Sequence, residues 1–236
     1  QVDKDGLLAE LRLRLPHLEL LHAAEDLRPY ECDGLSAYRC TPLLVALPER
    51  IEQVQGLLAL CHRLKVPVVA RGAGTGLSGG ALPLENGVLL VMARFRRILE
   101  IDPLGRFARV QPGVRNLAIS QAAAPHGLYY APDPSSQIAC SIGGNVAENA
   151  GGVHCLKYGL TVHNLLQVDI VTLEGERLSL GSSALDSAGF DLLALFTGSE
   201  GLLGVVVEVT VRLLPRPPVA KVLLASFDDV ESAGRA

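Results

Sequence analysis

The sequence predicts an α+β protein built from two lobes: a small parallel βαβ lobe, and a larger, mostly antiparallel lobe with helices. Residues 43–70 run from an apolar strand through an amphipathic helix to a second apolar strand, which is the βαβ pattern. Residues 97–111 and 165–180 each indicate a hairpin, and residues 204–215 alternate as one long strand. A chain of 236 residues, 49% of them hydrophobic, can bury cores of this size.

The elements of the first lobe follow from the hydrophobic pattern. A short helix is expected over residues 7–15, where Pro16 ends it. Strands are expected around residues 43–46 and over residues 66–70. Residues 48–64 are expected to form a helix, because apolar side chains recur along one helical face: Ile51, Val54, Leu57, Leu58 and Cys61.

The predictions for the second lobe depend more on turn residues than those for the first lobe do. The first hairpin turns at Asp102–Gly105, which fits a type I turn, and the second turns at Glu174–Gly175. A helix over residues 114–127 is expected to end near its proline and its final glycine. Another helix is expected from Ile142, with Ser141 as its N-cap. The long strand places four valines on one face: Val205, Val207, Val209 and Val211.

These elements divide the chain into four parts. They are a helical lead-in, the first lobe, the second lobe and a C-terminal part: residues 1–36, 37–96, 97–216 and 217–236. The family resemblance given below implies that the C-terminal part is the start of a truncated substrate (cap) domain. The last part indicates a strand over residues 219–226, a cap at Asp228 or Asp229, and the beginning of a helix. We expect this tail to be poorly anchored, because a lone strand cannot satisfy its own edge.

Composition and spacing exclude several classes of function. The formal net charge is −4 without a basic stripe, so nucleic acid is not an expected partner. Charge, Pro or Gly interrupts every apolar run before it reaches membrane-spanning length, and no signal-peptide pattern is present. The five cysteines include no C-x-x-C pair and the six histidines are dispersed, so we expect neither disulfides nor a metal site. These features predict a cytoplasmic protein with buried thiols.

The stretch VPVVARGAGTGLSGGALP, residues 66–83, gives the first indication of a binding site. Residues 74–79 satisfy G-x-G-x-x-G, which opens a helix in a dinucleotide-binding fold. Here Pro83 and Asn86–Gly87 leave no room for a useful helix before the apolar strand of residues 88–92. We therefore interpret the loop as a nest of backbone N–H groups that binds an anion. Three side chains would add donors: Arg71, Thr75 and Ser78.

Two further segments of the sequence are also rich in glycine. Residues 131–152 begin with a rigid Pro-Asp-Pro turn and place Gly143 and Gly144 in the first turn of a helix, where glycine lowers helix stability. Residues 196–209 enter the long strand through three more glycines. Close approach of a ligand would explain such glycines. Three glycine-rich turns from two lobes predict an elongated cofactor held between the lobes.

Four segments together resemble a known family: ARGAGTGLSGGALP, YYAPDPSSQIACSIGGNVAENAGG, KYGLTVHNLLQVDIVTLEGE and DLLALFTGSEGLLGVVVEVTVRLLP. They are similar to the PCMH-type FAD-binding domain of the vanillyl-alcohol oxidase / p-cresol methylhydroxylase superfamily. Within it they resemble the D-2-hydroxy-acid dehydrogenase branch, and most of all the flavin subunits of bacterial glycolate oxidases. The resemblance spans roughly residues 25–225.

The resemblance implies FAD held between the lobes. The loop would cradle the pyrophosphate: Arg71, Gly72, Ala73, Gly74, Thr75, Gly76, Leu77, Ser78, Gly79 and Gly80. The second segment would line the flavin ring and ribityl chain: Pro132, Asp133, Ser135, Ser136, Ile142, Gly143, Gly144, Asn149 and Gly152. The third would close on the adenine and ribityl side: Glu200, Gly201, Val205 and Val206. Some relatives carry a flavin-linking histidine where this chain has Thr75, so non-covalent FAD is implied.

The resemblance also implies a reaction. A 2-hydroxy acid, glycolate or D-lactate, would be oxidised to the 2-oxo acid by hydride transfer to flavin N5. The catalytic base and any metal site are expected beyond residue 236, so no catalytic residue is assigned, and His154 and His163 are interpreted as ordinary loop residues. Electrons would pass to a second flavin-type subunit and an iron–sulfur subunit, or to a quinone. Such partners would bring the protein to the inner face of the membrane.

Two alternatives stay open at this point. The chain could be a flavin-binding module without turnover of its own. It could also belong with the cell-wall enolpyruvyl-sugar reductases, which share the superfamily fold and use other catalytic residues. The segments YGLTVHN and GSEGLLG favour the hydroxy-acid branch.

Overall fold

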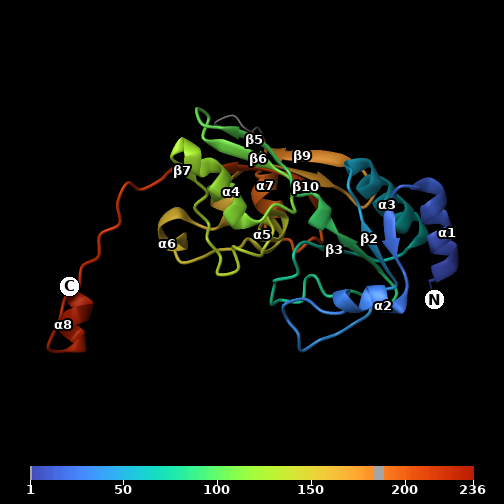
Figure 1. Cartoon of the computed structure of the whole chain (residues 1–236), viewed down its shortest axis with the longest axis horizontal. Helices are drawn as coiled ribbons and strands as arrows, with labels where there is room; N and C mark the ends of the chain where they lie inside the picture. Colours follow the sequence, from blue (N-terminus) through green and yellow to red (C-terminus); the bar gives the residue numbers. More distant parts are fainter. Residues whose placement is uncertain (1, 183–188) are drawn as a thin grey trace.

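The first sheet carries the parallel lobe. The computed structural model describes residues 2–182 and 189–236 (Figure 1). The strand order is β1-β2-β4-β3, with the bounds Glu19–Leu21, Leu44–Leu47, Val88–Val91 and Val68–Arg71. Strands β2, β4 and β3 are parallel, which confirms the βαβ prediction, whereas β1 pairs antiparallel with β2 and was not expected.

Helices α3 (Ile51–Leu64) and α1 (Lys4–Arg14) cover one side of this sheet. The apolar face predicted for α3 is buried, and Leu11 of α1 joins the same core. Helix α1 begins earlier than expected, because the Asp3 carboxylate caps it by accepting a hydrogen bond from the Gly6 N–H at 3.1 Å. The N-terminal segment therefore contributes both an edge strand and a helix to the first lobe.

A smaller core lies on the other side of the first sheet. It forms beneath α2 (Ala24–Leu27) and the 3₁₀ turn η1 (Arg28–Tyr30). Its buried members are aliphatic: Leu27, Val45, Leu47, Leu89 and Val91. Strands β2 and β4 are consequently buried on both faces, as is usual for parallel strands. After β4 comes the 3₁₀ turn η2, Met92–Arg94.

The second sheet is antiparallel and has the order β5-β6-β10-β8-β9. Its strands have the bounds Ile98–Asp102, Phe107–Val110, Val205–Arg212, Leu165–Val171 and Arg177–Gly181. Three helices pack their apolar side chains against one face: α4 (Asn116–Ala123), α5 (Ile142–Glu148) and α7 (Leu192–Phe196). Both predicted hairpins are present, and the Asp102 carboxylate stabilises the first turn by accepting from the Gly105 N–H at 2.9 Å.

Strand β10 departs from the regular alternation that its valines predict. The pairing with β8 shifts in register between Val206 and Glu208. Val205 and Val207 consequently pack in the first core, while the second core takes Val206, Val209 and Val211. The prediction that four valines share one face was wrong, because an irregularity of this kind changes which side of the sheet the following residues face.

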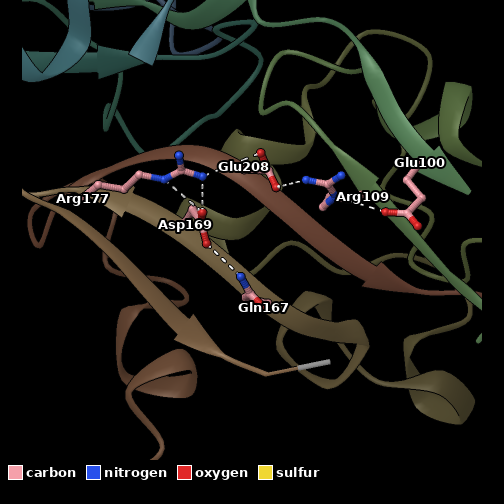
Figure 2. A network of polar contacts seen from close by, with 6 residues as sticks. All are labelled: Glu100, Arg109, Gln167, Asp169, Arg177 and Glu208. Carbon is pink, nitrogen blue, oxygen red and sulfur yellow. Dashed lines mark hydrogen bonds and ion pairs between the residues drawn. The ribbon is translucent and has the colours of Figure 1, made fainter. Parts of the chain in front are cut away.

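The opposite face of the second sheet carries a polar network that crosses all of its strands (Figure 2). Arg177 contacts the Asp169 carboxylate at 2.5 Å, and Asp169 also accepts from the Gln167 amide at 3.0 Å. Arg109 bridges Glu208 at 3.1 Å and Glu100 at 3.3 Å. Opposite charges therefore face each other across neighbouring strands, which stabilises the pairing.

Short elements complete the second lobe. Strands β7 (Leu128–Tyr129) and β11 (Leu214–Pro215) form a separate pair. The helix expected over residues 114–127 is α4 followed by a 3₁₀ turn, η3 (Ala124–His126), because Pro125 supplies no N–H to continue the α-helix. A short helix, α6 (Cys155–Tyr158), and a 3₁₀ turn, η4 (Thr161–Asn164), lead into β8.

The C-terminal tail leaves the body of the protein as an extended segment (red in Figure 1). The strand expected over residues 219–226 is absent, and Val222, Leu223 and Leu224 are all more than 90% exposed. No neighbouring strand offers an edge in this region of the described chain, so apolar pattern alone does not produce a strand. The predicted cap is present, since Asp229 accepts from the Ser232 N–H at 2.7 Å and precedes α8 (Val230–Arg235).

Candidate functional site

A cavity of about 330 Å³ lies between the two lobes, at the carboxyl end of β3 and the start of β10. Three separated segments build most of its wall: the glycine loop after β3, the region from residue 134 to α5, and residues 196–206. No helix follows the glycine loop, so the Rossmann interpretation stays excluded. The cavity lies between the lobes, where turns from both of them converge.

The structure brings many of the predicted residues into this wall: Arg71, Gly72, Ala73, Gly74, Thr75, Gly76, Leu77, Gly80, Ser136, Gly143, Gly144, Glu200, Gly201, Val205 and Val206. Other predicted residues do not line it: Ser78, Gly79, Pro132, Asp133, Ser135, Ile142, Asn149 and Gly152. Several lining residues were not predicted: Ala70, Ala81, Met92, Pro112, Pro134, Cys140, Ser141, Asn145, Ala147, Glu148, Ala150, Phe196 and Gly204.

Glycine is required in the loop for two different reasons. At Gly72, a Cβ atom would collide with the Ser141 hydroxyl, so the loop approaches the second lobe too closely for any side chain. At Gly74, φ is +68°, and a Cβ atom would also meet the Arg71 guanidinium. The backbone of the loop is therefore bare on the side that faces the cavity.

Arg71 contacts both the cavity and the N-terminal segment. It lines the cavity, but its Nη1 donates to the Cys32 carbonyl at 2.7 Å, and its guanidinium lies 5.9 Å from the centre of the Tyr30 ring. The cation–π contact and the hydrogen bond hold the guanidinium against the N-terminal segment. Arg71 thus fastens the glycine loop to that segment while it keeps a positive charge beside the cavity.

Glu148 is the functional candidate that sequence reasoning missed most clearly. Its carboxylate accepts a hydrogen bond from the Ser78 hydroxyl at 2.8 Å and crosses from α5 to the glycine loop. One signal could have found it, because Gly144, Ala147 and Glu148 fall at the i, i+3, i+4 spacing of one helical face. Its partner Ser78 was interpreted as a ligand donor, and in the structure the Ser78 hydroxyl donates to this carboxylate.

Ser141 provides a test of whether the wall fits a polar cofactor. It occupies the N-cap position of α5, as predicted, but its side chain makes no capping bond. The buried Oγ has no hydrogen-bond partner among the described residues, and the same holds for Ser199 Oγ. A buried hydroxyl without a partner costs free energy, so such an atom in a cavity wall indicates a ligand with polar groups. Glycine-lined backbone and this hydroxyl fit the phosphate and hydroxyl groups of a dinucleotide.

Three of the predicted residues outside the wall hold the segments that form it. Asp133 pairs with the His154 ring at 2.6 Å, which ties the Pro-Asp-Pro turn to the beginning of α6. Asn149 ends α5 in a left-handed conformation with φ of +49°, and its Oδ1 accepts from the Val162 N–H at 3.0 Å. Ile142 is fully buried in the second core. These residues shape the site without facing the cavity.

Two adjacent tyrosine side chains, Tyr129 and Tyr130, are held in their neutral forms. Burial raises the pKa of Tyr129 to about 12, with a further contribution from its hydrogen bond to Tyr158. Burial also raises the pKa of Tyr130. Cys140 is buried in the cavity wall. Within residues 2–182 and 189–236, no group of three His, Cys, Asp or Glu side chains is placed to hold a metal ion.

Comparison with known proteins decides the family. Residues 42–181 match the family described as FAD binding domain. The chain belongs to this family. The FAD-binding domain is 76% identical over 235 residues to the glycolate oxidase subunit GlcD of Escherichia coli strain K12, covering 100% of this chain and 47% of that protein.

Other relatives of the FAD-binding domain agree with this assignment. The GlcD subunit of Bacillus subtilis is 41% identical, covering 87% of this chain and 44% of its own length. A D-2-hydroxyglutarate dehydrogenase of Xanthomonas citri is 37% identical, covering 95% and 48%. The chain therefore spans about half the length of the relatives it matches. A solved alkyldihydroxyacetonephosphate synthase shares the fold, with a TM-score of 0.80 at 23% identity over 92% of this chain and 42% of that one.

The comparisons and the fold confirm FAD as the cofactor and the α+β, PCMH-type architecture as the fold class. Among the described residues, no helix combines the length and apolar character needed to cross a membrane.

Proposed function

We propose that this chain is the FAD-binding part of an FAD-dependent dehydrogenase that oxidises a 2-hydroxy acid, glycolate or D-lactate, to the 2-oxo acid. The observation that carries the proposal is a glycine-lined cavity between two lobes, in a chain 76% identical over its whole length to a glycolate oxidase subunit. A relative named D-lactate dehydrogenase, from Anaerostipes hadrus, is 35% identical over 84% of this chain. The four-part division of the chain at residues 36, 96 and 216 is part of this proposal.

The glycine loop would hold the FAD pyrophosphate. Its backbone N–H groups supply the donors, while Gly72 and Gly74 let the anion approach without a Cβ atom in the way. Arg71 adds positive charge at the edge of the cavity. The carboxylates of Glu148 and Glu200 lie beside Gly80 and would face hydroxyl or amine groups of the cofactor, because a carboxylate next to a phosphate is repelled. Thr75 cannot form the histidyl linkage, so this loop would hold FAD without a covalent bond.

The second segment would line the flavin ring and the ribityl chain. Ser136, Gly143 and Gly144 lie in the wall, and the unpartnered Ser141 hydroxyl supplies a donor or acceptor there. When bound, FAD supplies a two-electron acceptor for the α-hydrogen of the 2-hydroxy acid, and the hydroxyl proton goes to a base. This chain contributes orientation, exclusion of water and the hydrogen-bonding environment. The side chains that select the acid and take the proton are proposed to lie outside residues 1–236.

The partners belong to the same proposal. The relatives named glycolate oxidase subunit are parts of an assembly, which supports transfer of electrons to further subunits. We infer a second flavin-type subunit and an iron–sulfur subunit, or a quinone, as acceptors. A cytoplasmic location at the inner face of the membrane stays a prediction.

Anaerobic reduction of the bound flavin tests the proposal. Glycolate, D-lactate and D-2-hydroxyglutarate are added separately to the purified protein at its full natural length, and absorbance of the oxidised flavin is followed. We expect bleaching with glycolate or D-lactate and release of FAD, rather than FMN, on acid precipitation. Bleaching by none of the acids would overturn the proposed reaction, and reoxidation of the reduced flavin by an enolpyruvyl sugar would then favour the reductase alternative. A yellow protein that no substrate bleaches would instead support the binding-module alternative.

A further inference from the structure

Asn116 is a buried polar residue that lies behind the cavity wall. It belongs to the first turn of α4 and is 2% exposed. Its amide Nδ2 donates two hydrogen bonds, each of 3.1 Å, to the Pro132 carbonyl and to Asn145 Oδ1. One side chain therefore joins the beginning of the Pro132–Ser136 turn to the middle of α5.

Asn145 carries this contact into the cavity wall. It is 4% exposed and lines the cavity, and its Nδ2 donates to Cys140 Sγ at 3.3 Å. The backbone adds two bonds from the same turn of α4. The Asn116 N–H donates to the Cys140 carbonyl at 3.1 Å, and the Leu117 N–H donates to the Gln137 carbonyl at 3.0 Å. The start of α4 thus holds both ends of the segment from residue 132 to residue 145.

We propose that Asn116 is a positioning residue for the cofactor: it sets the separation between the Pro132–Ser136 turn and α5, and with it the cavity wall of Pro134, Ser136 and Asn145. The proposal rests on the proposed function, because it takes this wall as part of the FAD site. Asn116 touches neither cavity nor cofactor and acts through its two acceptors.

The physical reason is directionality. A hydrogen bond fixes both distance and angle, whereas contacts between apolar side chains tolerate sliding. Replacing Asn116 by an apolar residue removes both N–H donors. Pro132 O is then buried without this partner, and Asn145 Oδ1 keeps only the long bond from the Cys140 thiol at 3.7 Å. The free energy is then lowered when the turn and the helix move until these acceptors find other donors or water. That movement displaces the wall.

Asn164 offers a matched control. It is 3% exposed, and its Nδ2 also donates to two carbonyl groups, those of Tyr158 at 3.0 Å and Leu160 at 2.9 Å. It does not line the cavity and makes no contact with the Pro132–Ser136 turn through these bonds. Asn116→Leu and Asn164→Leu therefore remove the same chemistry at different places. Asn116→Ser, which keeps one donor, replaces the leucine variant if that variant does not fold.

The first measurement is made with FAD present. The dissociation constant of FAD and the visible absorption spectrum of the bound flavin are compared in the full-length wild type and the variants. We expect Asn116→Leu to weaken binding about tenfold, as expected for two buried acceptors that lose their donors, and to shift the flavin absorption bands. Asn164→Leu should change the FAD dissociation constant by less than about twofold and leave the flavin absorption bands in place. It should lower the melting temperature by about as much as Asn116→Leu does. Equal effects of the two leucine variants on FAD would overturn the positioning role.

The second measurement uses the protein without cofactor and separates this proposal from the proposed function. Hydrogen exchange of the Gln137 and Cys140 amides, which donate to Pro134 O and Ser136 O at 2.8 Å each, reports the turn directly. We expect Asn116→Leu or Asn116→Ser to speed their exchange, and Asn164→Leu to leave it unchanged. Unchanged exchange in the Asn116 variants would overturn the proposal. Failure of the wild type to bind FAD would overturn the proposed site but not this result.

Discussion

A close contact between the two lobes can be tested by changing one glycine. In Gly72→Ala, the new Cβ atom would overlap the Ser141 hydroxyl, whose own Cβ lies at an ordinary distance of 3.5 Å. Ser141 is 4% exposed, so its side chain has little space to move away. The backbone at Gly72 is not left-handed, so the cost comes from overlap alone. We expect a loss of about 1–3 kcal/mol in the free energy of unfolding, the usual range for overpacking.

A double-mutant cycle decides whether this overlap is the cause. Ser141→Ala removes a buried hydroxyl that has no partner among the described residues, so alone it should not lower the free energy of unfolding. Gly72→Ala/Ser141→Ala should recover most of the loss, which gives a coupling energy of about 1–2 kcal/mol. Gly76→Ala is the control in the same loop, because its Cβ would meet only Glu148 Oε1 at 3.7 Å.

The assay is urea unfolding of the protein without FAD, followed by circular dichroism, so that cofactor affinity does not enter the comparison. A double variant as unstable as Gly72→Ala would refute the reasoning. A Gly76→Ala variant that loses as much as Gly72→Ala would do the same, since the loss would then belong to any substitution in the loop.

Three further predictions concern other parts of the chain. Arg177→Met should lower the free energy of unfolding by about 1–2 kcal/mol at pH 7, because the buried Asp169 carboxylate loses its charged partner in the network of Figure 2 and keeps hydrogen bonds from Gln167 and Ser179. Arg177 is itself 44% exposed, which limits the loss. Burial opposes ionisation of Asp169, but hydrogen bonds from Gln167 and Arg177 outweigh burial and lower the pKa of Asp169. The resulting stabilisation is present above the unfolded pKa of about 3.9 and is lost as pH falls through the folded pKa. The difference in unfolding free energy between wild type and Arg177→Met should therefore shrink in acid, and a constant difference would contradict the assignment. Burial raises the pKa of Cys61 to about 12, so iodoacetamide at pH 8 should label Cys61 far more slowly in the native protein than in urea. Mass spectrometry of the Cys61 peptide measures the two labelling rates, and equal rates would mean that the core around α3 is open. Trypsin should cut first after Lys221, in the exposed tail, and an earlier cut within the glycine loop would show that the loop is the less ordered segment.

Sequence reasoning recovered the elements that short-range patterns determine. The apolar spacing of α3 and the valine-rich β strands depends on period, and the absence of a helix after Gly80 depends on Pro83 and Asn86–Gly87, all of which are local. Strand β1 was missed because its three residues gain order only by pairing with β2. The tail strand was wrongly expected for the converse reason, since its apolar residues have no edge to join.

The same distinction applies to the candidate site. Glycine density identified the three segments of the wall, because close approach needs residues without side chains. The contacts between segments were not visible in the sequence. The Ser78–Glu148 bond and the packing of Gly72 against Ser141 join residues that lie 70 and 69 positions apart in the chain (148 minus 78, and 141 minus 72). The Val206/Glu208 register shift is equally invisible, because a regular valine alternation gives no sign of it.

That register shift has a consequence for how the protein is made. Val205 and Val207 complete the first core, yet they are synthesised more than a hundred residues after β4, the last strand of the first sheet. A ribosome that has released residues 1–96 has exposed a first lobe whose hydrophobic interior still lacks these valines and Val171 of β8. The N-terminal half must therefore wait, partly ordered and in need of protection from aggregation, until β10 emerges and closes both interiors at once. Arresting synthesis before and after residue 212 and probing with protease would show this as a late, single gain of resistance across the two lobes.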